Sequence, residues 1–315
     1  MLARLQLFIT LGLLGLSIGW ALWWWQLDRP LMAIAGILVL FGGHAVVLAI
    51  EFLLVRLVNR QDPAPRASGL QLLAAWWGEV RAATRVFLWR QPFRSRRWPD
   101  RLPASARGRR GLLLVHGFVC NRGLWNPWLA QLTRLDIPFV AVNLEPVFGS
   151  IDEYAPVLEA AARRLEEATG LEPVVVAHSM GGLAVRYWLA GCGGVARVHH
   201  VITIGTPHRG TWLARFALSM NGTQMRLASP WHSALAAREQ QAAAAHFTCF
   251  YGHCDNIVMP ASTATLPGAH NRHLAGVAHV AMTDRPEVLE EALRRLRAPE
   301  AGVPSAAEPA LSPRG

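Results

Sequence analysis

Ser179 has the sequence surroundings of an activated serine. Four apolar residues, 174–177, precede it and are typical of a buried parallel strand. Gly181 and Gly182 follow it and allow a helix to pass close to the end of that strand. The pattern is a variant of the G-x-S-x-G nucleophile elbow, in which a tight strand-to-helix turn presents the serine hydroxyl. Such a serine can attack a carbonyl carbon, but five-residue patterns recur by chance, so the remaining residues must support the assignment.

An acid and a histidine follow Ser179 in the order nucleophile, acid, histidine that this elbow requires. Glu239 and Asp255 are the only carboxylates between Ser179 and His279. Asp255 follows an apolar strand, at the edge where open α/β sheets build their sites, whereas Glu239 lies in an alanine-rich segment. We therefore expect Asp255 to orient His279, which takes the Ser179 proton and passes it to the leaving alcohol.

Three downstream histidines could be the base. His279 follows the apolar segment 274–277, which we predict to be the last strand, and it precedes the final helix. His270 and His273 lie before that segment. The position just beyond a strand end favours His279.

Two backbone amides are expected to form the oxyanion hole. They belong to Met180, directly after the nucleophile, and to Phe118, just beyond another predicted strand. Each such donor is typically worth about 3 kcal/mol in the transition state. No cysteine spacing matches a zinc site, so we expect no metal, no cofactor and free thiols at Cys120, Cys192, Cys249 and Cys254.

The region 111–297 alternates strand-like and helical segments, which predicts the α/β class, with a mostly parallel central sheet flanked by helices. The predicted strands are 112–115, 138–143, 174–177, 201–204, 247–251 and 274–277, and the predicted helices are 125–135, 151–168, 183–190 and 286–296.

The segment 208–246 interrupts this alternation, and we interpret it as a cap or lid. Its apolar side chains follow no sheet pattern, which favours an acyl pocket between the strands. An additional helical layer is the alternative. The substrate-binding candidates are Trp212, Phe216, Met225 and Trp231.

Several motifs together resemble the α/β-hydrolases, closest to the bacterial triacylglycerol lipase and esterase-like branch. They are Leu-Leu-Leu-Val-His-Gly-Phe at 112–118, Ala-His-Ser-Met-Gly-Gly at 177–182, Ile-Thr-Ile-Gly-Thr-Pro-His-Arg-Gly at 202–210, Met-Arg at 225–226 through Ser-Pro-Trp at 229–231, Tyr-Gly-His-Cys-Asp-Asn-Ile-Val at 251–258 and Gly-Val-Ala-His at 276–279. Ala177 stands where the family more often has glycine. The resemblance implies serine-dependent ester hydrolysis, and it does not reach residues 1–110.

Residues 1–55 are predicted to form a transmembrane helical hairpin. Segments 7–25 and 31–50 are each apolar over a length that can cross a bilayer, and tryptophans cluster at the end of the first. A cleaved signal peptide, or an anchor followed by a core helix, is the alternative. Residues 56–110 form a basic connector, in which thirteen arginines and three acids account for the net charge of +10.

The connector contains a predicted amphipathic helix around residues 73–87. Its apolar side suits an anionic lipid surface, while packing against the hydrolase domain is an equal alternative. Glu79, Arg81 and Arg85 are expected on faces other than the apolar one. No nucleic-acid-binding motif accompanies the charge. The tail 298–315 is predicted to be disordered.

The prediction is therefore a membrane-anchored serine ester hydrolase acting on lipid-like esters, with no nucleic-acid partner and no protein partner indicated. An acyltransferase or thioesterase with the same triad, or a silent membrane scaffold, is the alternative. Arginines flank both ends of the hairpin, whereas its turn holds only Arg29 beside Asp28. Both termini are therefore expected in the cytoplasm of a bacterial cell, with the hydrolase domain beneath the inner membrane. The flanking residues are Arg4, Arg56, Arg60 and Arg66.

Overall fold

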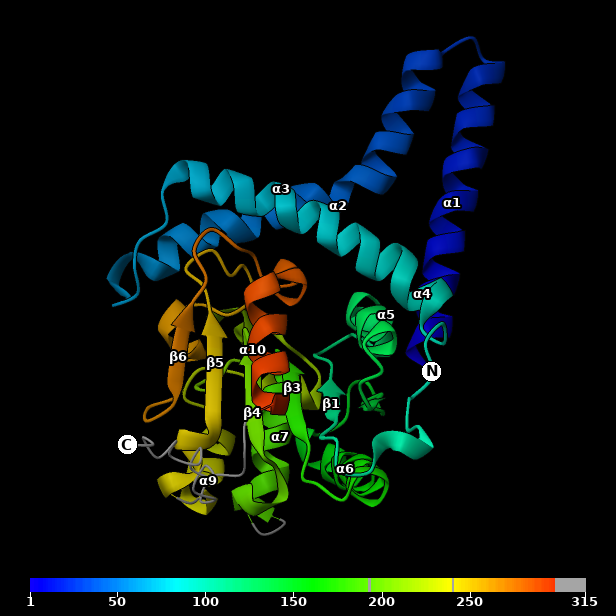
Figure 1. The fold of residues 1–315 in the computed structure, drawn as a ribbon. Coiled ribbons are helices and arrows are strands. Elements are labelled where there is room, and N and C mark those ends of the chain that lie inside the picture. Colours follow the sequence, from blue (N-terminus) through cyan, green and yellow to red (C-terminus); the bar gives the residue numbers. More distant parts are fainter. Residues whose placement is uncertain (192–193, 240, 298–315) are drawn as a thin grey trace, which may run out of the picture.

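The computed structural model describes residues 1–191, 194–239 and 241–297. The predicted disordered tail and Cys192 lie outside these residues. An α/β domain forms most of the described chain, and a long helical hairpin projects from it (Figure 1).

The α/β domain is built on one parallel sheet of six strands in the order β2-β1-β3-β4-β5-β6. The chain order reverses between β1 and β3, and at such a switch point the loops after two neighbouring strands separate and leave room for a site. The strands are β1 (Leu112–Val115), β2 (Phe139–Ala141), β3 (Val174–His178), β4 (His200–Ile204), β5 (Phe247–Tyr251) and β6 (His270–His273).

The last strand is not where the sequence predicted it. The prediction of a strand at 274–277 is wrong, because this segment forms a turn and β6 precedes it. β6 pairs only with β5 at the sheet edge, so its polar residues can remain partly exposed. Leu274 and Val277 are apolar because the turn buries them in the domain core.

Helices cover both faces of the sheet. Alternate residues of β1 and β3 point to opposite faces, as the pleat of a strand requires. One face packs against α6 (Ala155–Thr169) and α7 (Met180–Gly191), and the other against α5 (Asn126–Arg134) and α10 (Pro286–Arg297). Gly170 ends α6 in the left-handed conformation, with a φ of 74°.

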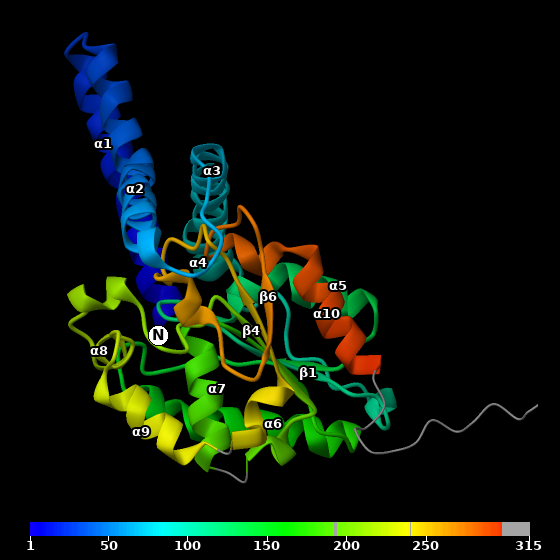
Figure 2. The same ribbon diagram turned by 90° about the vertical axis from the view of Figure 1, so that its left-hand side faces the viewer.

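The excursion after β4 contains two short α-helices, α8 (Met220–Gln224) and α9 (Pro230–Arg238), flanked by 3₁₀ turns. α9 packs beside α7 (Figure 2). Arg186 on α7 donates two hydrogen bonds of 2.7 Å to the Glu239 carboxylate, which fixes the end of α9 to the domain.

The hairpin consists of α1 (Leu2–Gln26) and α2 (Pro30–Val58), and both helices are long and apolar enough to cross a membrane. α3 (Gly69–Arg85) and the second half of α2 cross above the carboxyl ends of the strands (Figure 1). A short π-helical turn leads from α3 into α4 (Gln91–Arg94).

α3 presents two different faces. Small residues and Glu79 lie on the buried face against the α/β domain, whereas apolar side chains including Leu73 and Trp77 are exposed. As predicted, Glu79 lies on a different face of α3 from Leu73 and Trp77, but this face is buried against the domain, whereas Arg81 and Arg85 are exposed. Ala75 and Ala82, one turn to either side, are small enough to let the helix approach the domain and bury the carboxylate.

Candidate active site

Ser179 occupies a sharp turn between β3 and α7. Its backbone is in the left-handed region, with a φ of 56°, which costs a residue with a side chain roughly 1–3 kcal/mol. The turn is held by the Ser179 N–H, which donates to the Ile204 carbonyl at 2.8 Å, and by the Thr206 hydroxyl, which donates to the Ser179 carbonyl at 2.9 Å. These bonds fix the strained residue in place.

The two glycines after Ser179 allow α7 to start close to the neighbouring strand ends. A Cβ atom at Gly181 would lie 2.5 Å from the His116 carbonyl oxygen, and one at Gly182 would overlap the Thr206 side chain. Larger residues at either position would push the helix away and displace the serine.

Asp255 and His279 form a buried hydrogen-bonded pair. His279 Nδ1 lies 3.0 Å from Asp255 Oδ2, and the exposed fractions of the two residues are 4% and 1%. The other carboxylate oxygen of Asp255 accepts the N–H groups of Ile257 and Val258. Burial alone would lower the pKa of His279, but the charge and hydrogen bond of Asp255 outweigh it, so the pKa is raised above its ordinary value.

The strand ends bring this pair next to the serine turn. Gly205, which follows β4, lies so close that a Cβ atom there would be 3.0 Å from both Asp255 Oδ2 and His279 Nδ1. Glycine has no Cβ atom, so it fits at this position without crowding the pair. Its N–H donates a hydrogen bond to a backbone carbonyl of β5. Within the described residues, the Ser179 hydroxyl has no hydrogen bond to His279. This contact commonly tightens only when substrate binds.

His178 packs against His279 from the serine side. The two ring centroids are 4.6 Å apart, and His178 Nε2 donates to the His279 carbonyl at 3.3 Å. Burial, reinforced by the charge of His279, holds the pKa of His178 well below its ordinary value. His178 is therefore a neutral neighbour that fixes the backbone of His279.

The loop after β1 also approaches the serine turn. A Cβ atom at Gly117 would lie 2.7 Å from Ser179 Cβ, so the following residue, Phe118, is close to the serine turn. His116 shapes this loop: its Nδ1 donates to the Gly117 carbonyl at 2.9 Å and its Nε2 accepts the Leu144 N–H at 3.0 Å. Burial lowers the pKa of His116 to about 4, which keeps the ring neutral.

The four predicted pocket residues do not form one group. Met225 is buried in the core, and Trp231 packs against the same core while donating to Asp152 at 2.7 Å. Trp212 and Phe216 form a separate edge-to-face pair with ring centroids 5.6 Å apart. Phe216 is exposed, whereas Trp231 is only partly exposed and Met225 is buried.

Three cysteines are buried, namely Cys120, Cys249 and Cys254. Burial raises the pKa of Cys120 to about 12 and those of the other two to about 11. Thiols with such pKa values are poor nucleophiles. No group of three or more His, Cys, Asp or Glu side chains among the described residues could hold a metal ion.

Three polar residues behind the acid and histidine were not predicted from the sequence. They are Glu51 on α2, Glu79 on α3 and Asn256, which directly follows Asp255. Glu79 is the only carboxylate between Asp62 and Asp100, which was the one sequence signal that could have singled it out.

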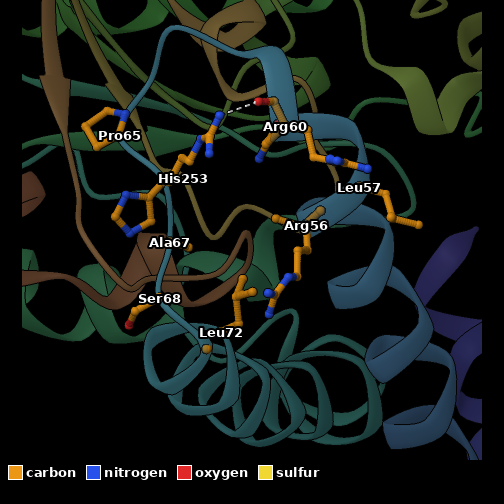
Figure 3. Close-up of a pocket in the computed structure, with 12 residues that line it drawn as sticks. Arg56, Leu57, Arg60, Pro65, Ala67, Ser68, Leu72 and His253 are labelled. Atoms are coloured by element: carbon orange, nitrogen blue, oxygen red, sulfur yellow. Dashed lines mark hydrogen bonds between the residues drawn. The ribbon is translucent and has the colours of Figure 1, made fainter.

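A concave region lies between the end of α2 and the start of α3. Its volume is about 480 Å³, and Figure 3 shows it bounded by the connector on one side and by His253 on another. Arg56, Arg60 and Arg66 line it, and within the described residues none of them forms an ion pair with a carboxylate. Arg66 instead donates to the Arg60 carbonyl at 3.0 Å.

Comparison with known proteins identifies the fold. No family model matches the sequence, and a search of curated proteins finds no match. The mature lipase BlEst2 of Bacillus licheniformis has a TM-score of 0.52 at 16% identity, over 62% of this chain and 95% of the lipase. Lipase B of Aspergillus fumigatus has a TM-score of 0.56 at 20% identity, over 67% of this chain and 58% of that lipase. The chain is similar to both in architecture and has the α/β-hydrolase fold.

Proposed function

We propose that this protein is a membrane-anchored serine hydrolase that cleaves lipid-like acyl esters. Ser179 is the nucleophile, His279 the general base and acid, and Asp255 the residue that orients His279. The amides of Phe118 and Met180 form the oxyanion hole. The observation that carries the proposal is the buried His279–Asp255 pair at 3.0 Å, beside a serine held at a φ of 56°.

The reaction has two stages, acylation of Ser179 and hydrolysis of the acyl-serine. Ser179 Oγ attacks the ester carbonyl carbon while His279 Nε2 accepts its proton, and the two amides stabilise the oxyanion. The intermediate collapses, the alcohol leaves with the proton from His279, and the acyl group remains on Ser179. Water then attacks the acyl-serine with His279 as base, the bond between the acyl carbon and Ser179 Oγ breaks, His279 returns the proton to Oγ, and the carboxylic acid leaves. Asp255 stabilises the imidazolium in both stages.

The N-terminal helices support a substrate that resides in or on a membrane. α1 and α2 have the length and composition of membrane spans, and α3 exposes apolar side chains. The cavity is lined by three arginines that form no ion pair with a carboxylate in the described part of the chain, which suits an anionic head group at the membrane surface, and each arginine close to such a surface contributes about 1 kcal/mol. Both solved proteins named above are lipases, which agrees with this choice of substrate.

A fluorophosphonate probe and an ester panel test the assignment. We expect the full chain in detergent to label with the probe and to hydrolyse esters, and Ser179→Ala to abolish both. Ser233→Ala, at an exposed serine on α9, is the matched control and should behave as wild type. Failure of the wild type to label would refute the enzyme assignment and favour a silent scaffold.

The same panel separates the alternative activities. A hydrolase transfers the acyl group from oxygen esters mainly to water, so free acid remains the main product when a dilute alcohol is added. An acyltransferase would transfer the acyl group to the alcohol in preference to water, and a thioesterase would prefer thioesters. Equal labelling of Ser179→Ala and wild type would show that another residue is the nucleophile.

A further inference from the structure

Glu79 reaches the loop that carries His279 from a different part of the chain. Its carboxylate is 1% exposed and accepts the Val280 N–H at 2.9 Å and the Ala281 N–H at 3.1 Å. These are the two amides directly after His279. A single side chain on α3 therefore holds the backbone on which the histidine depends, about 200 residues away along the sequence.

Glu51 makes a second connection from α2. Its carboxylate accepts Asn256 Nδ2 at 2.7 Å, and Asn256 Oδ1 accepts the His279 N–H at 3.2 Å. Asn256 is completely buried. The chain Glu51–Asn256–His279 thus fixes the backbone nitrogen of the histidine, while Glu79 fixes the two nitrogens that follow.

Both contacts come from helices that lie outside the sheet and its covering helices. α2 is the second helix of the hairpin, and α3 lies beside it above the carboxyl ends of the strands (Figure 1). The sheet positions the strand ends that precede Ser179, Asp255 and His279. The backbone around His279 also depends on side chains that the sheet does not supply.

The charged groups that face Glu79 are His279 and Asp255, and Glu51 acts on the same two residues from α2. Burial raises the pKa of Glu79 to about 7, against the hydrogen bonds from Val280 and Ala281 and the charge of His279, which lower it. The negative charge of Glu79 in turn raises the pKa of His279. The carboxylate therefore stabilises the imidazolium that forms during the reaction, in addition to holding its backbone.

We propose that Glu79, together with Glu51, is a positioning residue for His279, so that helices of the hairpin and connector complete the active site. The inference rests on the proposed function. Neither glutamate touches the reacting atoms; each acts through the backbone and the charge of His279.

Substitution of Glu79 tests the proposal in the full chain in detergent. Glu79→Gln keeps the size but loses the charge, and its amide group can accept only one of the two N–H bonds. We expect kcat for a soluble ester to fall about 10- to 100-fold, as small misplacements of a catalytic group do, with little change in KM. The acid limb of the kcat/KM profile should move to lower pH, because His279 loses a negative neighbour.

Two further variants complete the test. The first separates the effect of the charge from that of the side-chain length. Glu79→Asp keeps the charge on a shorter side chain, so kcat should fall while the acid limb stays close to its wild-type pH. Glu51→Ala, at a partly buried site, provides a second test if Glu79→Gln does not fold, and it should lower kcat and move the acid limb in the same direction. The fold of each variant is checked by tryptophan fluorescence.

The matched control is Glu291→Gln, which removes the charge of another glutamate that is 3% exposed and lies on α10. It should lower stability through its lost arginine partners and leave the pH profile unchanged. A folded Glu79→Gln or Glu51→Ala with wild-type kcat and acid limb would overturn the inference. If Ser179→Ala were still active, the proposed function would fail instead, so the two failures are distinguishable.

Discussion

The protonation of His279 is governed by opposing effects at the scale of single residues. Burial favours the neutral ring, whereas Asp255 and Glu79 favour the imidazolium, and the carboxylates prevail. A base must be neutral to accept a proton. The raised pKa therefore makes the ring a stronger base and also moves the pH below which it is protonated and inactive to a higher value.

We predict that kcat/KM falls with decreasing pH through a pKa above 6.5, the ordinary value for histidine. Asp255→Asn should lower kcat about 10⁴-fold, because the amide cannot stabilise the imidazolium, and it should move the acid limb to lower pH. Initial rates with a soluble ester between pH 5 and 9 would measure both effects.

The control for this variant is Glu239→Gln, which alters the other carboxylate between Ser179 and His279. Glu239 forms an ion pair with Arg186, so the variant should lose stability and keep its pH profile. Activity that depended on Glu239 and not on Asp255 would reverse the assignment of the acid.

The sequence was informative where the chain order alone limits the choice. Only two carboxylates lie between Ser179 and His279, and the structure pairs Asp255 with the predicted histidine. Glu79 could not be found in this way, because its importance comes from burial against amides about 200 residues distant. Helical periodicity describes the faces of α3 but does not state which face the α/β domain will cover.

At the scale of elements, apolar character and strand formation are separate properties. The turn 274–277 is apolar because it is buried, while the true strand β6 carries His270, Asn271, Arg272 and His273 at a sheet edge. The position of His279 beyond the last strand remained correct, since the turn simply lengthens the loop that carries it. The alternation of strands and helices was therefore enough to place His279 beyond the last strand, although one strand boundary was wrong.

The excursion between β4 and β5 contains both buried and exposed apolar residues, and we predict different effects for the two kinds. Phe216→Ala and Leu218→Ser, at side chains that are 66% and 97% exposed, should weaken activity on long-chain esters and leave stability nearly unchanged. Met225→Ala, in the core, should instead lower the free energy of unfolding by about 2–5 kcal/mol.

Chain-length preference measured on esters of increasing length, together with urea unfolding, distinguishes these effects. Leu135→Ala at the end of α5, also exposed, is the control for loss of a surface apolar group. If Phe216 and Leu218 variants kept the wild-type preference, the excursion would be an additional helical layer and not part of an acyl pocket.

At the scale of the whole molecule, the hairpin and α3 contact the loops of the candidate active site. Besides the two glutamates on α2 and α3, Gln6 on α1 donates to the carbonyl of Val119, the residue after Phe118, at 3.3 Å. Gln6 also donates to Gln91 at 2.8 Å. α1 thus contacts the loop after β1, α2 reaches His279 through Asn256, and α3 contacts the loop that follows His279, which couples the geometry of the candidate site to the seating of these helices.

Because the α/β domain is attached to the hairpin, the orientation of the hairpin decides on which side of the membrane the candidate site lies. Arginines follow the second span and only one lies in the turn, so the positive-inside rule predicts that both termini lie in the cytoplasm. We predict that in a bacterial host a C-terminal alkaline phosphatase fusion is inactive, whereas a C-terminal fluorescent protein is bright. Replacing Arg56, Arg60 and Arg66 with glutamine should weaken this bias, while Arg134→Gln on α5 should not. An active phosphatase with a dark fluorescent fusion would place the α/β domain outside the membrane and reverse the predicted topology.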